Sequence, residues 1–178
     1  MLEIKCIGRA GQGAVTFSQI LAIGAFYDKK YCQAMPAFGV ERRGAPSFSY
    51  TRINDKPVNI RSLITHPDII VLLDASLIES IDVAEGLKKD GIIIVNSSKK
   101  PEELGLGNFK IFTVDASSTA LNIFKADIVN TAMLGAFAAV TKQVSLKGIN
   151  HGLNERFKRK DILKKNQEAV KEVYDNLK

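Results

Sequence analysis

The residues best suited to ligand chemistry lie in a glycine-rich turn near the start of the chain. Its glycines are Gly8, Gly11 and Gly13. An alternating apolar segment precedes the turn and a continuous apolar segment follows it, which predicts a strand, a tight turn and a helix N-terminus. Unpaired backbone N–H groups and the helix dipole favour an anion there, and glycines let the backbone approach a phosphate. Arg9 and Thr16 could add a charged and a hydroxyl contact, so the turn is a candidate phosphate site.

The order of the glycines narrows the class of phosphate ligand. The turn reads G-x-x-G-x-G, whereas the dinucleotide fingerprint reads G-x-G-x-x-G and needs an acidic residue about 20 residues further on. Asp28 has roughly that spacing, but it stands where a helix is expected to end. The sequence contains no G-x-x-x-x-G-K-[ST] motif, which argues against a P-loop nucleotide hydrolase. The turn therefore predicts a phosphate ligand other than NAD, and a tight turn without a ligand remains the alternative.

The other reactive residue types form no catalytic or metal-binding set. Asp74 and Asp115 each follow an apolar run, at the edge of the sheet where ligands often bind, but helix capping is the simpler role for both. His66 and His151 have no ligand partner at a neighbouring position. The two cysteines form no CxxC pair, which predicts a reduced chain without a zinc or iron–sulfur site of its own.

The apolar patterns predict an α/β domain that is Rossmann-like, with three layers and a mostly parallel sheet. Continuous aliphatic runs at residues 68–74 and 91–96 are typical of strands buried on both faces of a parallel sheet. Two segments joined by a turn predict an antiparallel hairpin near residues 46–62. Further strands are expected at residues 2–8, 31–35 and 110–114, and helices at 14–28, 76–89, 130–144 and in a basic C-terminal segment at about 145–178.

The composition is that of an ordinary globular protein. The chain has 178 residues, of which 46% are hydrophobic and 25% are charged, and this length predicts one domain over residues 1–178. No apolar run approaches the roughly 20 residues of a membrane span. The N-terminal residues lack the pattern of a signal peptide. We therefore expect a cytoplasmic protein with no membrane partner.

The net charge of +6 is concentrated near the C-terminus. Residues 142–178 contain ten basic and five acidic residues, whereas residues 1–141 are nearly neutral. Acidic residues interrupt the basic run, and the absence of Trp argues against a base-stacking surface. We interpret the segment as a solvated helix face, with docking onto an acidic protein as the alternative, and we expect no nucleic-acid partner.

Two ordered motifs resemble the γ subunit of the multisubunit 2-oxoacid:ferredoxin oxidoreductases, closest to the pyruvate and ketoisovalerate branch. The first is Gly8-Arg-Ala-Gly-Gln-Gly-Ala-Val-Thr16. The second runs from Tyr31 to Pro46 and contains Glu41-Arg-Arg-Gly-Ala-Pro46. The resemblance covers about residues 1–145 and fades in the basic segment.

The resemblance implies a subunit that is not catalytic by itself. Enzymes of this family oxidatively decarboxylate a 2-oxoacid to an acyl-CoA and pass the electrons to ferredoxin. By resemblance, thiamine diphosphate, Mg²⁺ and 4Fe–4S clusters are held by partner α, β and δ subunits, while this chain helps to bind coenzyme A. The alternatives are a scaffolding module of the same complex, or the γ subunit of a ketoisovalerate or 2-oxoglutarate enzyme.

The expected coenzyme A contacts come from the two motifs. They are Gly8, Arg9, Gly11, Gln12, Gly13, Thr16, Arg42 and Arg43. The guanidinium groups of Arg42 and Arg43 could bind a phosphate in bidentate fashion, or they could pair across a subunit interface, which we favour slightly. A solvated pair, with Glu41 balancing one charge, is the third interpretation.

Overall fold

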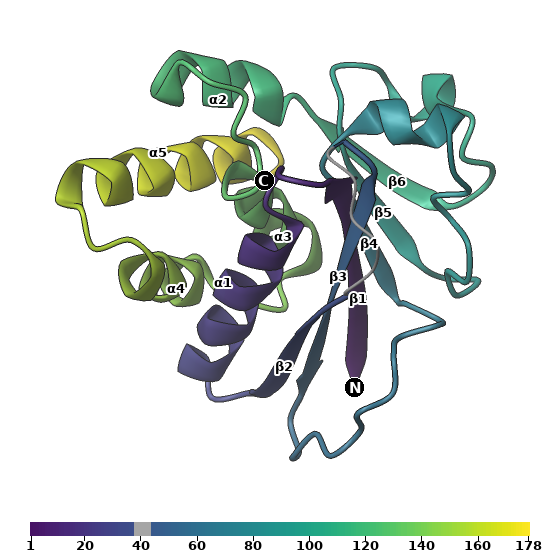
Figure 1. The fold of residues 1–178 in the computed structure, drawn as a ribbon, viewed down its shortest axis with the longest axis horizontal. Helices are drawn as coiled ribbons and strands as arrows, with labels where there is room; N and C mark the ends of the chain where they lie inside the picture. The colour runs from purple at the N-terminus through teal and green to yellow at the C-terminus, as the bar shows by residue number, and fades with distance from the viewer. Residues whose placement is uncertain (38–43) are drawn as a thin grey trace.

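The computed structural model describes residues 1–37 and 44–178, and a six-stranded sheet forms its centre (Figure 1). The strands are β1 (Leu2–Arg9), β2 (Tyr31–Pro36), β3 (Pro46–Asn54), β4 (Ile69–Leu72), β5 (Ile92–Asn96) and β6 (Lys110–Val114). They lie in the order β2-β3-β1-β4-β5-β6. β1, β4, β5 and β6 pair in parallel, whereas β3 runs antiparallel between β1 and β2. The expected α/β fold with a mostly parallel sheet is confirmed.

α-Helices cover one face of the sheet, and short 3-10 helices with their loops cover the other (Figure 1). The α-helices are α1 (Ala14–Tyr27), α2 (Ala116–Phe124), α3 (Ala132–Thr141), α4 (Leu146–Arg156) and α5 (Lys160–Asn176). The 3-10 helices are η1 (Ala75–Glu79) and η2 (Pro101–Leu104). Within residues 1–37 and 44–178, no helix combines the length and the apolar character that crossing a bilayer requires.

Each face of the sheet has its own hydrophobic cluster, which explains why the central strands are aliphatic throughout. In β4, Ile69 and Val71 belong to the cluster under the α-helices, while Ile70 and Leu72 belong to the cluster on the opposite face. All four side chains are buried. A shift of register by one residue would exchange the two sets, so the packing on both faces fixes the position of the strand.

The hairpin expected near residues 46–62 is wrong in its second half. β3 forms, but residues 57–62 are not a strand, and β3 pairs with β1 and β2 instead. Both edges of β3 are therefore occupied, and no edge is left for another strand. The segment is held beside the sheet by Arg52, whose guanidinium donates to the backbone oxygen of Ile60 (3.3 Å).

The helix expected at residues 76–89 is also wrong. η1 ends at Glu79, and turns follow it. At Gly86 the backbone has a φ of 76°, and an added side-chain carbon would lie 2.1 Å from the backbone oxygen of Thr65. The chain turns there against the loop that leads into β4, in a conformation that a regular helix does not allow.

Glycines set the contact between α1 and α4. A side-chain carbon added at Gly148 would lie 2.6 Å from the backbone oxygen of Gly24, and one added at Gly152 would lie 2.6 Å from that of Ile20. The second contact lies four residues later on α4 and four residues earlier on α1 than the first. The two helices are therefore antiparallel and closely packed. One further step brings the last turn of α4 to the first turn of α1, directly after the glycine turn.

Candidate functional site

The glycine turn, residues 8–13, connects the end of β1 to the start of α1. Gly11 and Gly13 both have positive φ values, of 96° and 85°. At Gly13 an added side-chain carbon would lie 2.2 Å from the Nδ2 atom of Asn130, whereas at Gly11 it would meet nothing within 4 Å. Gly13 is therefore required both by its backbone conformation and by the approach of Asn130.

Arg9, the expected phosphate ligand, uses its guanidinium within the protein. Its Nε donates to Asp74 (3.0 Å), an NH2 hydrogen goes to the hydroxyl of Ser76 (2.8 Å), and NH1 donates to the backbone oxygen of Gly44 (3.1 Å). The Arg9 side chain is 36% exposed and that of Asp74 is 20% exposed. In this geometry Arg9 fastens the glycine turn to the ends of neighbouring segments.

Gln12 braces the same turn. Its Oε1 accepts the backbone N–H of Arg9 (2.7 Å), and its Nε2 donates to Asp74 (2.9 Å). Burial raises the pKa of Asp74, but the hydrogen bonds that it accepts from Ser76 and Gln12 act in the opposite direction. Together with the Arg9 guanidinium they hold the pKa of Asp74 below its ordinary value. Asp74 is thus the anchor of the turn, a role beyond the helix capping expected for it.

The second motif of the sequence reaches the same place. The backbone N–H of Ala10 donates to the oxygen of Ala45 (2.8 Å), and Gly44 accepts from Arg9. Arg42 and Arg43 lie outside the described residues, so their expected roles stay predictions. The residues directly after them are tied to the glycine turn.

A cavity of about 360 Å³ opens at the first turn of α1. We call it the basic cavity. Its lining comprises Thr16, Phe124, Ile128, Asn130, Arg156, Phe157, Ile162, Lys165 and Asn166. Of the expected contact residues, Thr16 lines this cavity, whereas Arg9 and Gln12 do not and bond to Asp74 instead.

The walls of the basic cavity come from α1, α2, the segment before α3, the end of α4 and α5, and long-range contacts hold several of them together. Asn130 donates to the backbone oxygen of Gly13 (3.3 Å), which joins the segment before α3 to the glycine turn. The hydroxyl of Thr131 donates to Asn166 (2.6 Å), which joins the same segment to α5. Arg156, the last residue of α4, reaches the cavity because α4 packs antiparallel against α1. The shape of the cavity is thus fixed by long-range contacts.

The electrostatics of the basic cavity favour an anion. Its lining contains Arg156 and Lys165 and no acidic residue. Within the part of the chain that the structure describes, neither cation forms an ion pair with a carboxylate. The sequence placed both residues on a solvated helix face, and the only signal that could have marked them was the basic run itself.

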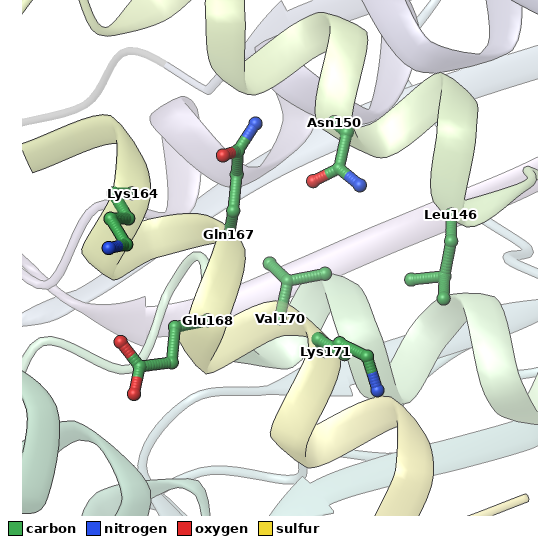
Figure 2. Close-up of a pocket in the computed structure, with 7 residues that line it drawn as sticks. All are labelled: Leu146, Asn150, Lys164, Gln167, Glu168, Val170 and Lys171. Carbon is green, nitrogen blue, oxygen red and sulfur yellow. The ribbon is translucent and has the colours of Figure 1, made fainter. Parts of the chain in front are cut away.

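A larger and more open groove of about 720 Å³ lies between α4 and α5 (Figure 2). It is lined by Leu146, Asn150, Lys164, Gln167, Glu168, Val170 and Lys171. Figure 2 shows charged side chains of both signs along α5 at this groove. No residue of the glycine turn or of the first turn of α1 lines it, so it is separate from the candidate site.

The other residues that the sequence marked as reactive make structural contacts. Asp115 caps α2 by accepting the backbone N–H of Ser118 (2.9 Å). His151 stacks on Tyr27, with ring centroids 4.3 Å apart. In residues 1–37 and 44–178, no group of three or more His, Cys, Asp or Glu side chains has an arrangement suited to a metal ion. Burial raises the pKa of the Cys6 thiol.

Comparison with known proteins decides the family. Residues 3–176 match the profile described as pyruvate ferredoxin/flavodoxin oxidoreductase. The chain belongs to this family. Similar members are the pyruvate synthase subunit PorC of Methanocaldococcus jannaschii, 49% identical over 99% of this chain and 97% of that protein, and the pyruvate/ketoisovalerate oxidoreductases common subunit gamma of Pyrococcus furiosus, 45% identical over 98% and 96%.

A solved structure of the family has the same fold. The pyruvate oxidoreductase subunit PORC of Thermotoga maritima superimposes with a TM-score of 0.86 at 38% sequence identity, over 98% of this chain and 95% of that one. The resemblance to γ subunits that the two sequence motifs indicated is confirmed over the whole chain.

Proposed function

We propose that this chain is the γ subunit of a cytoplasmic pyruvate:ferredoxin oxidoreductase, which decarboxylates the 2-oxoacid to an acyl-CoA and passes electrons to ferredoxin. The observation that carries the proposal is the sequence identity of 49% and 45%, over nearly the full length of the chain, to subunits named for pyruvate synthase and for pyruvate/ketoisovalerate oxidoreductases. Because the names of these relatives include both substrates, pyruvate is the first substrate to test and ketoisovalerate the second.

The redox and decarboxylation chemistry belongs to partner subunits in this proposal. A 4Fe–4S cluster is held by four cysteine thiolates, and this chain contains two cysteines in all. These are Cys6, buried on β1, and Cys32, on β2. We therefore assign the clusters, thiamine diphosphate and Mg²⁺ to the α, β and δ subunits, and we assign to the γ chain the binding of coenzyme A and the packing against the catalytic subunits.

The glycine turn supports a contact with the phosphates of coenzyme A. Gly11 is exposed with open space around it, so the backbone of the turn is accessible there, and α1 presents the N–H groups of its first turn together with the hydroxyl of Thr16. Coenzyme A supplies the thiol that accepts the acyl group. Arg9 and Gln12 shape the turn through Asp74, and the backbone groups and Thr16 meet the ligand.

The engagement of Arg9 by Asp74 also favours a second function, in which the chain is a scaffold without a ligand. A turn whose charged side chain is already paired can serve as a rigid docking element. The two functions differ in one measurable property, which is the affinity of the assembled complex for coenzyme A.

The first experiment tests membership of the complex. The α, β and δ subunits are purified with and without this chain, and pyruvate- and coenzyme A-dependent reduction of ferredoxin is measured. We expect the four chains to co-purify and the activity to fall when the γ chain is omitted. A complex that assembles without this chain and forms acyl-CoA at the full rate contradicts the proposal.

The second experiment separates ligand binding from scaffolding. Thr16→Val keeps the shape of the side chain and removes its hydroxyl, and Thr113→Val on β6 serves as the control outside the site. Calorimetry of coenzyme A against the complex should show a several-fold weaker affinity for Thr16→Val only. Equal affinities for the two variants and the wild type favour the scaffold.

A further inference from the structure

The basic cavity has the size and wall composition of a small-molecule site. Its volume of about 360 Å³ falls in the range of pockets that enclose organic ligands. Phe124 and Phe157 contribute aromatic surface, and Ile128 and Ile162 contribute aliphatic surface. Ile128 is 49% exposed, so part of its side chain is open to a ligand in the cavity. These walls suit a flat, largely apolar ring system.

The same cavity has a positive end. Arg156 and Lys165 line it without an acidic residue, and the N-terminus of the 14-residue helix α1 reaches it at Thr16. A guanidinium, an ammonium and a helix N-terminus are each suited to a phosphate, and here they occur in one cavity. A ligand that matches both ends of the cavity has a phosphate as well as a ring.

Asn130 supplies the third feature. It is 7% exposed and lines the cavity, and its Nδ2 donates to Gly13. Among the described residues its Oδ1 accepts no hydrogen bond. A buried acceptor without a donor destabilises a protein, because it has lost its hydrogen bonds to water. A ligand with an N–H group removes that penalty.

We infer that the basic cavity binds a purine nucleoside phosphate, whose ring system, ring-bound amine and phosphate match the apolar walls, the Asn130 acceptor and the two cations. The source is either a free adenine nucleotide or the nucleotide end of coenzyme A. The second source rests on the function proposed above, whereas the first does not.

The binding test uses the full chain and matched pairs of variants. Arg156→Ala/Lys165→Ala removes the cations of the cavity, and Lys160→Ala/Lys164→Ala removes two exposed lysines of α5 outside it. Calorimetric titration with ADP should give at least a tenfold weaker affinity for the first double variant and an unchanged affinity for the second. Equal weakening by both pairs would show attraction to general basic charge and would overturn the inference.

A second pair tests the apolar walls without endangering the fold. Ile128→Trp fills the cavity, whereas Leu121→Trp enlarges a similarly exposed side chain of α2 that does not line it. ADP binding should be lost in the first and kept in the second. Binding of ADP to Ile128→Trp with wild-type affinity places the nucleotide elsewhere and overturns the inference, as does a wild-type chain that binds no ADP at millimolar concentration.

Titration with coenzyme A and with adenosine 3′,5′-bisphosphate identifies the source. If the cavity variants weaken both, the ligand is the nucleotide end of coenzyme A, and if they weaken only ADP, it is a free nucleotide; both results support the inference. The two proposals fail separately. A chain that binds ADP in this cavity but does not assemble with α, β and δ contradicts the γ-subunit function alone. A functional complex whose affinity for nucleotides is unchanged by the cavity substitutions contradicts this inference alone.

Discussion

The glycine turn and the basic cavity adjoin each other at Gly13, yet they use their charged groups in opposite ways. In the turn, Arg9 has three internal partners and its carboxylate, Asp74, is also bonded to Gln12. In the cavity, Arg156 and Lys165 are exposed and unpaired with carboxylates in the described part of the chain. The charges of the glycine turn are thus neutralised within the fold, whereas the cations of the basic cavity remain available to a ligand.

The comparison shows that a motif suited to phosphate binding need not use its most obvious residue for that purpose. A guanidinium that is already satisfied by three acceptors gains little from a phosphate, because the new contact must replace existing ones. An unpaired cation at a helix N-terminus has no such competition. We therefore expect substitutions in the turn to reduce stability and substitutions in the cavity to reduce binding.

The largest expected effect is at Gly13. Gly13→Ala combines a φ of 85° with a contact of 2.2 Å to Asn130, so we expect a loss of about 3 kcal/mol or more in the free energy of unfolding. Gly11→Ala has a φ of 96° but open space around it, and we expect about 1 kcal/mol. Urea denaturation of both variants provides the measurement. Equal losses would show that Asn130 yields to the added methyl group.

A smaller effect is expected at Asp74, compared with the other strand-end aspartate. Asp74→Ala leaves Arg9 and Gln12 without their shared acceptor and should lower stability by about 2 kcal/mol. Asp115→Ala removes a helix cap alone and should lower it by about 1 kcal/mol. Thermal and urea unfolding would measure both. If Asp115→Ala is the more damaging, Asp74 is not the anchor of the turn.

The pH dependence of stability sharpens the same point. Because the pKa of Asp74 is lower in the folded protein than in the unfolded chain, the ionised carboxylate stabilises the fold fully above the ordinary carboxyl pKa of about 4. That stabilisation is lost as the pH falls through the lower, folded value. The difference in unfolding free energy between wild type and Asp74→Asn should therefore shrink between about pH 5 and pH 2. A difference that is constant over this range contradicts the assigned hydrogen-bond network.

The smallest effect on stability is expected in the basic cavity. Arg156→Ala and Lys165→Ala remove exposed cations, and we expect each to change the free energy of unfolding by less than about 0.5 kcal/mol. Urea denaturation measured alongside Asp74→Ala gives the comparison directly. A loss as large as that of Asp74→Ala would mean that these cations are structural, and the contrast between the two regions would disappear.

Much of the fold followed from local pattern. The aliphatic runs of β4 and β5 were predicted because burial on both faces leaves no polar positions, and the glycine turn was predicted because strand, glycines and helix occur in order along the chain. The hairpin partner at residues 57–62 was not, because β3 pairs with strands from elsewhere in the chain. A helix was expected after Asp74, but turns follow η1 there, because the backbone at Gly86 passes close to that of Thr65.

The candidate site divides in the same way. Sequence motifs identified the turn and Thr16, and they gave Arg9 a ligand role without indicating its partners. Asp74 lies 65 residues away and becomes the partner of Arg9 only because β1 and β4 are adjacent and parallel. Asn130 stands at the start of the helix expected at residues 130–144, and its contact with Gly13 spans 117 residues.

By itself the sequence determined most of the strands and helices, the glycines of the turn and the family, because each depends on residues that are neighbours in the chain. Only the tertiary structure decided which cations are available. Arg9 is paired by an aspartate that strand order brings to it, and Arg156 reaches the start of α1 because Gly148 and Gly152 let two helices pack closely. Such contacts depend on the summed packing of distant segments, and no local pattern of residues specifies them.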